Sequence, residues 1–290
     1  MLKPSQAGRA PATTVEEVHE VVRGYPYTDL GNGRILYDFI REHRIRRVLE
    51  LGVCHGVSAC YAAAAVASQG GDGCVVAVDR MEVAAFRPGI LSFTEKLGLT
   101  EVVIPFFERA TYNWRLRDFL CTDPRPVFDL VFLDGAHTWE PDSLAFLLSE
   151  KLLRPGGWWI FDDLNWSIGT SPTARRAGPG QITLGADEVE ALQVRDVINL
   201  IVLPHPHLAS WRENGKWGFA RKKTLAELAA DGLLDGPLRE KAAATLAHAR
   251  ENFPEPIAVP PDLRPEAWQR AVNRGLEANR NARLARAAPA

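Results

Sequence analysis

Short apolar runs alternate with segments of helical length through the middle of this 290-residue chain. Alternation of strand and helix at this spacing is typical of a doubly wound parallel sheet with right-handed crossover connections. We therefore predict an α/β, Rossmann-like fold. The predicted strands are residues 47–51, 74–78, 102–107, 128–133 and 158–161.

A hairpin is predicted to complete the sheet. Residues 207–212 and 216–220 flank Asn214 and Gly215, and an Asn-Gly pair between two strand-like runs is a strong hairpin signal. The expected sheet is therefore seven-stranded and mostly parallel, with an antiparallel pair at its end. Residues 186–202 are predicted as one helix that passes into a strand near its end.

Helical segments are predicted on both sides of the sheet domain. Residues 13–17 carry an N-cap followed by acids, which predicts a helix to about Arg23. A second helix is predicted after Gly33, and alanine-rich helices are predicted at the end of the chain. The expected division is an N-terminal helical segment (1–45), a sheet domain (46–223) and a helical appendage (224–290). The N-terminal helices could cover the sheet, form an oligomer contact or close over a substrate, and the sequence leaves these alternatives open.

The overall composition is that of an ordinary globular protein, at 46% hydrophobic and 24% charged residues with a net charge of −2. Nothing in this balance favours nucleic acid or an anionic membrane as a partner. The start of the chain lacks the apolar core of a signal peptide, and the longest apolar stretches are too short to span a bilayer. The four cysteines have no CxxC spacing, so reduced thiols and a cytoplasmic location are expected.

Acidic side chains follow two of the predicted strands. Asp134 and His137 come directly after residues 128–133, and Asp162 and Asp163 come directly after residues 158–161. Ligands of open parallel sheets bind just beyond the carboxyl ends of the strands. Because unpaired charge is costly to bury in a structural core, this cluster predicts a reaction site.

A glycine turn follows the first predicted strand. Gly52 and Gly56 allow a tight turn and leave backbone amides open to a ligand at the start of the next helix. Asp79 ends the second strand, 79 − 52 = 27 residues later, where an acid can bind a ribose diol. Cys54 stands where a dinucleotide-binding turn has its second glycine, which disfavours a pyrophosphate ligand.

These motifs, in this order, resemble those of the class I S-adenosylmethionine-dependent methyltransferases, and among them the catechol O-methyltransferase-like and macrolide-sugar O-methyltransferase-like metal enzymes. The resemblance covers residues 48–163. It implies a cofactor site for S-adenosylmethionine (SAM) and a site for Mg²⁺ or another divalent cation, with His137 as the catalytic base. The cofactor-binding residues implied are Glu50, Gly52, Gly56, Ser58, Asp79, Ala110, Thr111 and Asp134, and the metal ligands are Asp134, Asp162 and Asp163. Catechol-type enzymes have Asp-Asn at the last position, so the Asp-Asp pair favours the sugar-modifying group.

The chemistry of these residue types is consistent with those roles. Mg²⁺ prefers oxygen ligands and leaves coordination positions for substrate and water. Histidine, with an unperturbed pKa of about 6.5, suits a base at neutral pH. We expect a methyltransferase acting on a hydroxyl of a small molecule, a natural-product sugar or a polyphenol, and a homo-oligomer is possible. Residues 165–185 are rich in Gly, Ser, Thr and Pro and are predicted to form an acceptor-covering loop.

Several alternatives stay open at this point. His137 could be a capping or core histidine, Asp162 and Asp163 could cap a turn, and Trp139 and Trp166 could be core residues rather than walls of an acceptor pocket. The same fold also serves metal-independent enzymes and other reactions. A nicotinamide-dependent oxidoreductase and a non-catalytic cofactor-binding subunit are the remaining alternatives.

Overall fold

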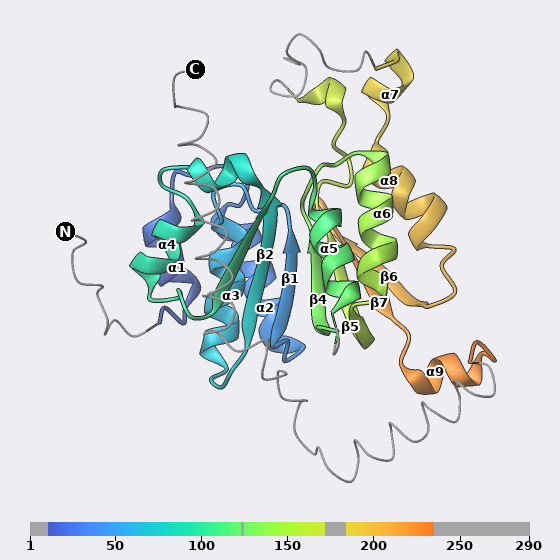
Figure 1. Cartoon of the computed structure of the whole chain (residues 1–290), viewed down its shortest axis with the longest axis horizontal. Helices are drawn as coiled ribbons and strands as arrows, with labels where there is room; N and C mark the ends of the chain where they lie inside the picture. The colour runs from blue at the N-terminus through green and yellow to red at the C-terminus, as the bar shows by residue number, and fades with distance from the viewer. Residues whose placement is uncertain (1–10, 123–124, 172–183, 235–290) are drawn as a thin grey trace, which may run out of the picture.

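The computed structural model describes residues 11–122, 125–171 and 184–234. A seven-stranded sheet lies at its centre, with the order β3-β2-β1-β4-β5-β7-β6 (Figure 1). Strands β1 to β5 run parallel to one another, and β7 is antiparallel to both β5 and β6. The predicted sheet and its terminal hairpin are therefore confirmed. The strands are β1 (Arg47–Leu51), β2 (Cys74–Arg80), β3 (Val103–Glu108), β4 (Phe128–Leu133), β5 (Leu153–Phe161), β6 (Leu208–Asn214) and β7 (Trp217–Lys222).

Strand order reverses between β1 and β4, at the middle of the sheet. Leu51 of β1 lies beside Leu133 of β4, so the loops that follow these two strands leave the sheet side by side. Both strands are buried along their whole length because helices cover both faces of the sheet. The position where strand order reverses is the expected ligand site of such a fold.

Helices pack on both faces of the sheet (Figure 1). One face carries the two N-terminal helices, the alanine-rich α3 and α4, while the other carries α5, α6 and α8. The N-terminal helices thus share a core with α3, the first of the alternatives left open by the sequence. The helices are α1 (Val15–Val22), α2 (Leu30–Glu42), α3 (Val57–Ser68), α4 (Ile90–Leu97), α5 (Tyr112–Cys121), α6 (Trp139–Glu150), α7 (Ala186–Glu190), α8 (Gln193–Val197) and α9 (Leu225–Ala230), with short 3₁₀ turns at Met81–Ala85 and Ile168–Thr170.

Two predicted boundaries were wrong. Helix α2 begins at Leu30 rather than after Gly33, because the Asp29 carboxylate accepts a hydrogen bond from the Asn32 amide (2.8 Å) and caps the helix there. Strand β5 begins at Leu153, before the predicted start at residue 158, and includes the Pro-Gly-Gly segment at residues 155–157. Proline has no amide to donate, and the pairing of β5 with β4 is irregular at this end.

The predicted single helix over residues 186–202 was also wrong. It is divided into α7, α8 and a π-helical turn at Ile198–Val202. Ala191 adopts an extended conformation (φ −60°, ψ 140°), and the Gln193 side chain turns the chain by bonding to the Glu188 carbonyl and the Trp139 amide.

Parts of two further predictions lie outside the described residues. Helix α9 opens the predicted C-terminal appendage, whose residues 235–290 are outside the described part. Of the predicted acceptor-covering loop, residues 172–183 are likewise outside it. Among the described helices, none has the length and apolar character needed to cross a bilayer.

Candidate active site

The turn after β1 is pressed against the loop after β4. Gly52 has φ +94°, and a Cβ placed there would lie 1.9 Å from the Asp134 carbonyl oxygen. The Asp134 amide in turn donates to the Leu51 carbonyl (2.8 Å). Gly56 has φ +87°, and its Cβ would lie 2.6 Å from Ile90 Cβ. Both glycines are therefore required by backbone packing, and this packing brings the turn to the edge where strand order reverses.

Asp79, at the end of β2, is bonded to the same turn. Its Oδ2 accepts hydrogen bonds from the amides of Val53 (2.6 Å) and Cys54 (2.8 Å). Cys54 has the left-handed conformation (φ 48°), which is uncommon for a residue other than glycine. The carboxylate thus helps to hold the turn in shape. Asp79 and the turn both lie at the carboxyl ends of the parallel strands, the side of the sheet that we call the site edge.

Glu50 and Ser58 form a buried pair beneath the turn. Glu50 is fully buried, and its Oε1 accepts a hydrogen bond from Ser58 Oγ (2.5 Å). Oε2 has no hydrogen-bond partner among the described residues. Burial raises the pKa of Glu50 well above its usual value. An unpaired buried oxygen is costly, and it is found here next to the turn that the sequence assigns to a ligand.

Ala110 and Thr111 lie between β3 and α5, beyond the carboxyl end of β3. Thr111 caps α5 by accepting a hydrogen bond from the Asn113 amide (3.1 Å), and Ala110 is exposed. Strand β3 is the neighbour of β2, so both residues follow a strand end on the same edge as Asp79.

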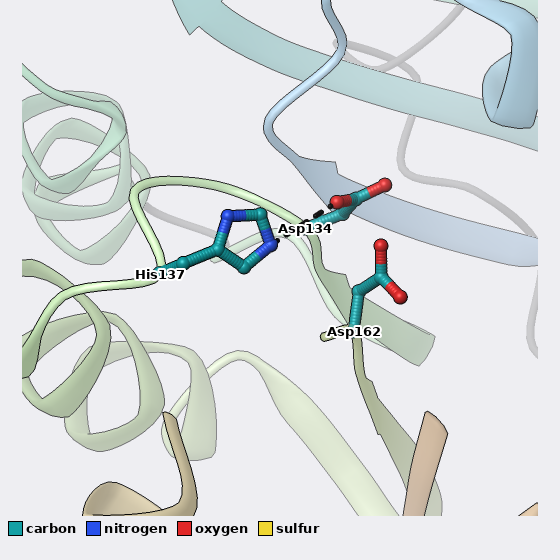
Figure 2. Close-up of side chains that lie close together, drawn as sticks. All are labelled: Asp134, His137 and Asp162. Carbon is teal, nitrogen blue, oxygen red and sulfur yellow. Dashed lines mark ion pairs between the residues drawn. The ribbon is translucent and has the colours of Figure 1, made fainter. Parts of the chain in front are cut away.

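Three side chains converge at the centre of this edge (Figure 2). Asp134, His137 and Asp162 each offer one ligand atom within 4.8 Å of the others. Figure 2 shows the His137 imidazole directed toward the two carboxylates. His137 Nε2 lies 3.4 Å from Asp134 Oδ1, an ion-pair distance without the alignment of a hydrogen bond, and this buried nitrogen has no hydrogen-bond partner among the described residues. The sheet brings the cluster together because β4 and β5 are adjacent.

The two loops that carry these groups contain left-handed residues. His137 has φ 55° and Asp163 has φ 54°. Such conformations in residues other than glycine cost about 1–3 kcal/mol and cluster at functional sites. Asp163 Oδ2 lies 3.8 Å from His137 Nε2, but Asp163 is not among the three groups that converge.

The cluster strongly perturbs the pKa values of its members. Burial lowers the pKa of His137, but the neighbouring Asp134 and Asp163 carboxylates outweigh burial and raise it to about 9. Burial and the nearby Asp134 raise the pKa of Asp162 to about 7, although Lys216 acts in the opposite direction. In the protein alone, the neighbouring acids therefore favour the protonated form of His137.

Lys216 is a residue of this edge that the sequence analysis missed. Its ammonium donates hydrogen bonds to Asp162 Oδ2 (2.9 Å) and to Asp163 Oδ1 (3.0 Å). The hairpin pairing could have revealed it, since β7 runs antiparallel to β5 with Phe161 opposite Gly218. A residue just before β7 must then lie beside the residues just after β5.

The two tryptophans near the cluster have different surroundings. The Trp166 ring lies beside His137, with 5.4 Å between ring centroids. Trp139 packs against the core on the α5–α6 face, and its amide donates to Gln193 Oε1. Trp166 is therefore the one placed to border a bound acceptor.

A divalent cation fits this edge in part. Asp134 and Asp162 bring two carboxylates together, and the unpaired His137 Nε2 lies beside them. Carboxylate oxygens are suitable ligands for Mg²⁺. Asp163, the third carboxylate of the predicted ligand set, is bonded to Lys216.

The sequence and the structure were compared with known proteins. A family model described as a methyltransferase domain matches residues 49–164, and no curated protein matches the sequence. Among solved structures, the chain is similar to an O-methyltransferase from Bacillus cereus in complex with SAH (19% identity, 72% of this chain and 90% of that chain, TM-score 0.52). It is also similar to the O-methyltransferase TomG from Streptomyces achromogenes in complex with SAM (18%, 72% and 89%, 0.52) and to the SAH-bound methyltransferase PaMTH1 from Podospora anserina (18%, 73% and 88%, 0.52).

At these identities the solved structures establish the fold, and the family model establishes the domain. The matched residues include the glycine turn after β1, Asp79, the Asp134–His137 loop and the Asp162–Asp163 pair. Residues 49–164 are thus a methyltransferase domain, and the fold is that of the O-methyltransferases to which the chain is similar.

Proposed function

We propose that this enzyme transfers the methyl group of SAM to a hydroxyl oxygen of a small molecule, a natural-product sugar or a polyphenol. The observation that carries the proposal is the convergence of Asp134, His137 and Asp162 beside the turn that begins at Gly52. The O-methyltransferases of similar fold support oxygen as the acceptor atom. The proposal assigns the reaction to residues 46–223, with residues 1–45 and 224–290 as flanking segments.

The cofactor side of the proposed site is the glycine turn with its supporting acids. Asp79 holds the turn through Oδ2 and would bind the ribose hydroxyls. Glu50 and Ser58 lie under the turn, where the methionine part of SAM would bind. Gly52, Gly56 and Asp134 line this side, and Ala110 and Thr111 after β3 would border the adenine.

The acceptor side is the acid cluster with His137. The acceptor oxygen attacks the methyl carbon as the carbon–sulfur bond breaks, and His137 takes the hydroxyl proton. Asp134, Asp162 and Asp163 would hold a divalent cation, whose positive charge would favour ionisation of the acceptor hydroxyl. A positive charge near Asp134, from the sulfonium of SAM or from such an ion, would lower the pKa of His137 and so oppose the effect of the acids.

A metal-independent methyltransferase is the second candidate. The observation in its favour is Lys216, whose ammonium already supplies a cation to Asp162 and Asp163. Turnover in EDTA separates the two candidates, because a site that needs a divalent ion loses its activity when the ion is removed.

The proposal is tested with the variant His137→Ala and a panel of catechols and hydroxylated sugars. We expect SAM affinity to be retained and kcat to fall by about 10²–10⁴, the range for general acid–base catalysis. His205→Ala is the matched control, since His205 packs against Phe146 just before β6, at the end of the strands opposite to the acid cluster. Unchanged turnover of His137→Ala at saturating metal would assign the proton to a water or another residue. If the wild type methylates no hydroxylated acceptor, the proposed acceptor class is wrong.

A further inference from the structure

Lys216 bridges the two adjacent acids that follow β5. Its ammonium lies 2.9 Å from Asp162 Oδ2 and 3.0 Å from Asp163 Oδ1. The backbone of Lys216 is held separately, because the Leu164 amide donates a hydrogen bond to the Lys216 carbonyl (3.0 Å). The Lys216 side chain is 32% exposed. The ammonium can therefore leave the acids by a side-chain rotation, with the hairpin backbone in place.

The contacts of Asp162 make Lys216 a direct competitor for a ligand position. Asp162 Oδ1 accepts hydrogen bonds from Trp217 Nε1 (2.5 Å) and from the Asp163 amide (2.8 Å). A carboxylate oxygen has two acceptor positions, so these two bonds fill Oδ1. Oδ2 is the oxygen left for a cation, and Lys216 is bonded to it.

Lys216 is also bonded to Asp163 Oδ1, and the Asp163 carboxylate does not join Asp134, His137 and Asp162 in the converging set. Asp163 Oδ2 lies 3.8 Å from His137 Nε2. A cation bound through Asp162 Oδ2 and Asp163 would therefore share these carboxylates with the ammonium or displace it. An ammonium and a divalent ion bound to the same carboxylates would also repel each other, because both are positively charged.

We propose that Lys216 is a tethered competitor of the divalent cation, which occupies the Asp162–Asp163 pair in the metal-free enzyme and weakens metal binding. This inference rests on the proposed metal site. It differs from a purely structural role for Lys216, in which the ammonium only fastens the start of β7 to the end of β5. A structural fastener would leave the metal affinity unchanged or support it, whereas a competitor lowers it.

The experiment measures Mn²⁺ binding to the full chain by calorimetry and by electron paramagnetic resonance, in the presence of SAH. We expect Lys216→Met to bind Mn²⁺ roughly ten- to a hundredfold more tightly than the wild type. In the wild type the ion must break the hydrogen bonds of Lys216 to charged groups, and this fold-change corresponds to their contribution. Lys216→Arg keeps the charge and should bind about as weakly as the wild type. Lys223→Met is the matched control, because the Lys223 ammonium contacts Asp231 and the Pro206 carbonyl instead of the acid cluster.

Equal or weaker Mn²⁺ binding by Lys216→Met overturns the competition and leaves the metal site standing. If neither protein binds Mn²⁺ while both bind SAH, the metal part of the proposed function fails, and the competition fails with it. SAH binding also reports that each variant is folded. The transfer of methyl groups in EDTA is measured separately, so the loss of the metal proposal is distinguishable from the loss of the methyltransferase assignment.

Discussion

Tyr112 links the proposed cofactor side of the site to the loop that carries His137. It is the first residue of α5 and is buried, with 5% of its surface exposed. Its hydroxyl donates a hydrogen bond to the buried carboxylate of Asp142 and accepts one from the Ala136 amide (3.3 Å). Burial and Asp142 raise the pKa of Tyr112 far above its usual value, so the hydroxyl keeps its proton. The variant Tyr112→Phe removes both bonds and little else.

The expected loss of stability follows from these two bonds. A hydrogen bond to a charged group contributes about 1.5–3 kcal/mol, and a neutral one about 0.5–1.5 kcal/mol. At 3.3 Å the bond to Ala136 belongs at the low end of its range. We therefore expect Tyr112→Phe to lower the free energy of unfolding by about 2–4 kcal/mol. Because the His137 loop loses a support, kcat should fall by about 10- to 100-fold, as small misplacements of catalytic groups typically cause.

Urea denaturation and steady-state kinetics check this prediction, with Tyr37→Phe as the matched control. Tyr37 of α2 is equally buried, and the one hydrogen-bond partner of its hydroxyl among the described residues is the Thr13 carbonyl (2.5 Å), away from the His137 loop. The control should lose about 0.5–1.5 kcal/mol and keep its kcat. A loss below about 0.5 kcal/mol in Tyr112→Phe would refute the assignment of the Tyr112 bonds as a support of this loop.

Two further predictions concern other carboxylates. Asp79→Ala should weaken SAM binding by roughly ten- to a hundredfold, because hydrogen bonds to an ionised partner are lost, and calorimetry of the folded variant with unchanged affinity would remove Asp79 from the cofactor site. Lys222→Met should lower the free energy of unfolding by about 3–5 kcal/mol, because it leaves the buried Glu150 carboxylate without the ammonium that lies 2.9 Å away. Loss of the exposed Arg23–Glu20 pair is the comparison, and it should change the free energy of unfolding by less than about 1 kcal/mol. Burial alone raises the pKa of Glu150, but Lys222 and His207 outweigh burial and lower it below 4.5, so this stabilisation is present above that pH and is lost as the pH falls through the lowered value. Acid titration of the unfolding free energy should therefore show a smaller loss in Lys222→Met than in the wild type.

The sheet and much of its edge could be predicted from local sequence. Apolar runs such as residues 128–133 predict strands without reference to distant residues, because a strand buried on both faces needs apolar side chains at every position. The parallel order then places Asp79, Asp134 and Asp162 on one edge, since every strand of such a sheet ends on the same side. The Asn214–Gly215 turn likewise specifies a hairpin from its own residue types.

Other features depend on contacts between residues far apart in the chain. Helix α2 starts at Leu30 although glycines follow, and Gly33 packs against Tyr61, since a Cβ placed at Gly33 would lie 2.5 Å from the Tyr61 ring. The segment after residue 185 turns where the Gln193 side chain bonds to the Trp139 amide. These two residues are more than fifty positions apart, so local propensity could not predict the contact.

The surroundings of the acids were decided by the tertiary structure. The sequence by itself determined that acidic residues and His137 lie at the strand ends, because strand type and order follow from local patterns. It did not determine that Lys216 bonds to Asp163, that His137 lies close to Asp134 and Asp162, or that the Tyr112 hydroxyl bonds to the Ala136 amide in the loop of His137. Those contacts depend on the antiparallel return of β7 beside β5 and on the packing of α5 against α6, which bring together side chains separated by tens of residues. Local propensity acts over a few residues, whereas the charge, burial and pKa of each group in this site are set by such distant neighbours.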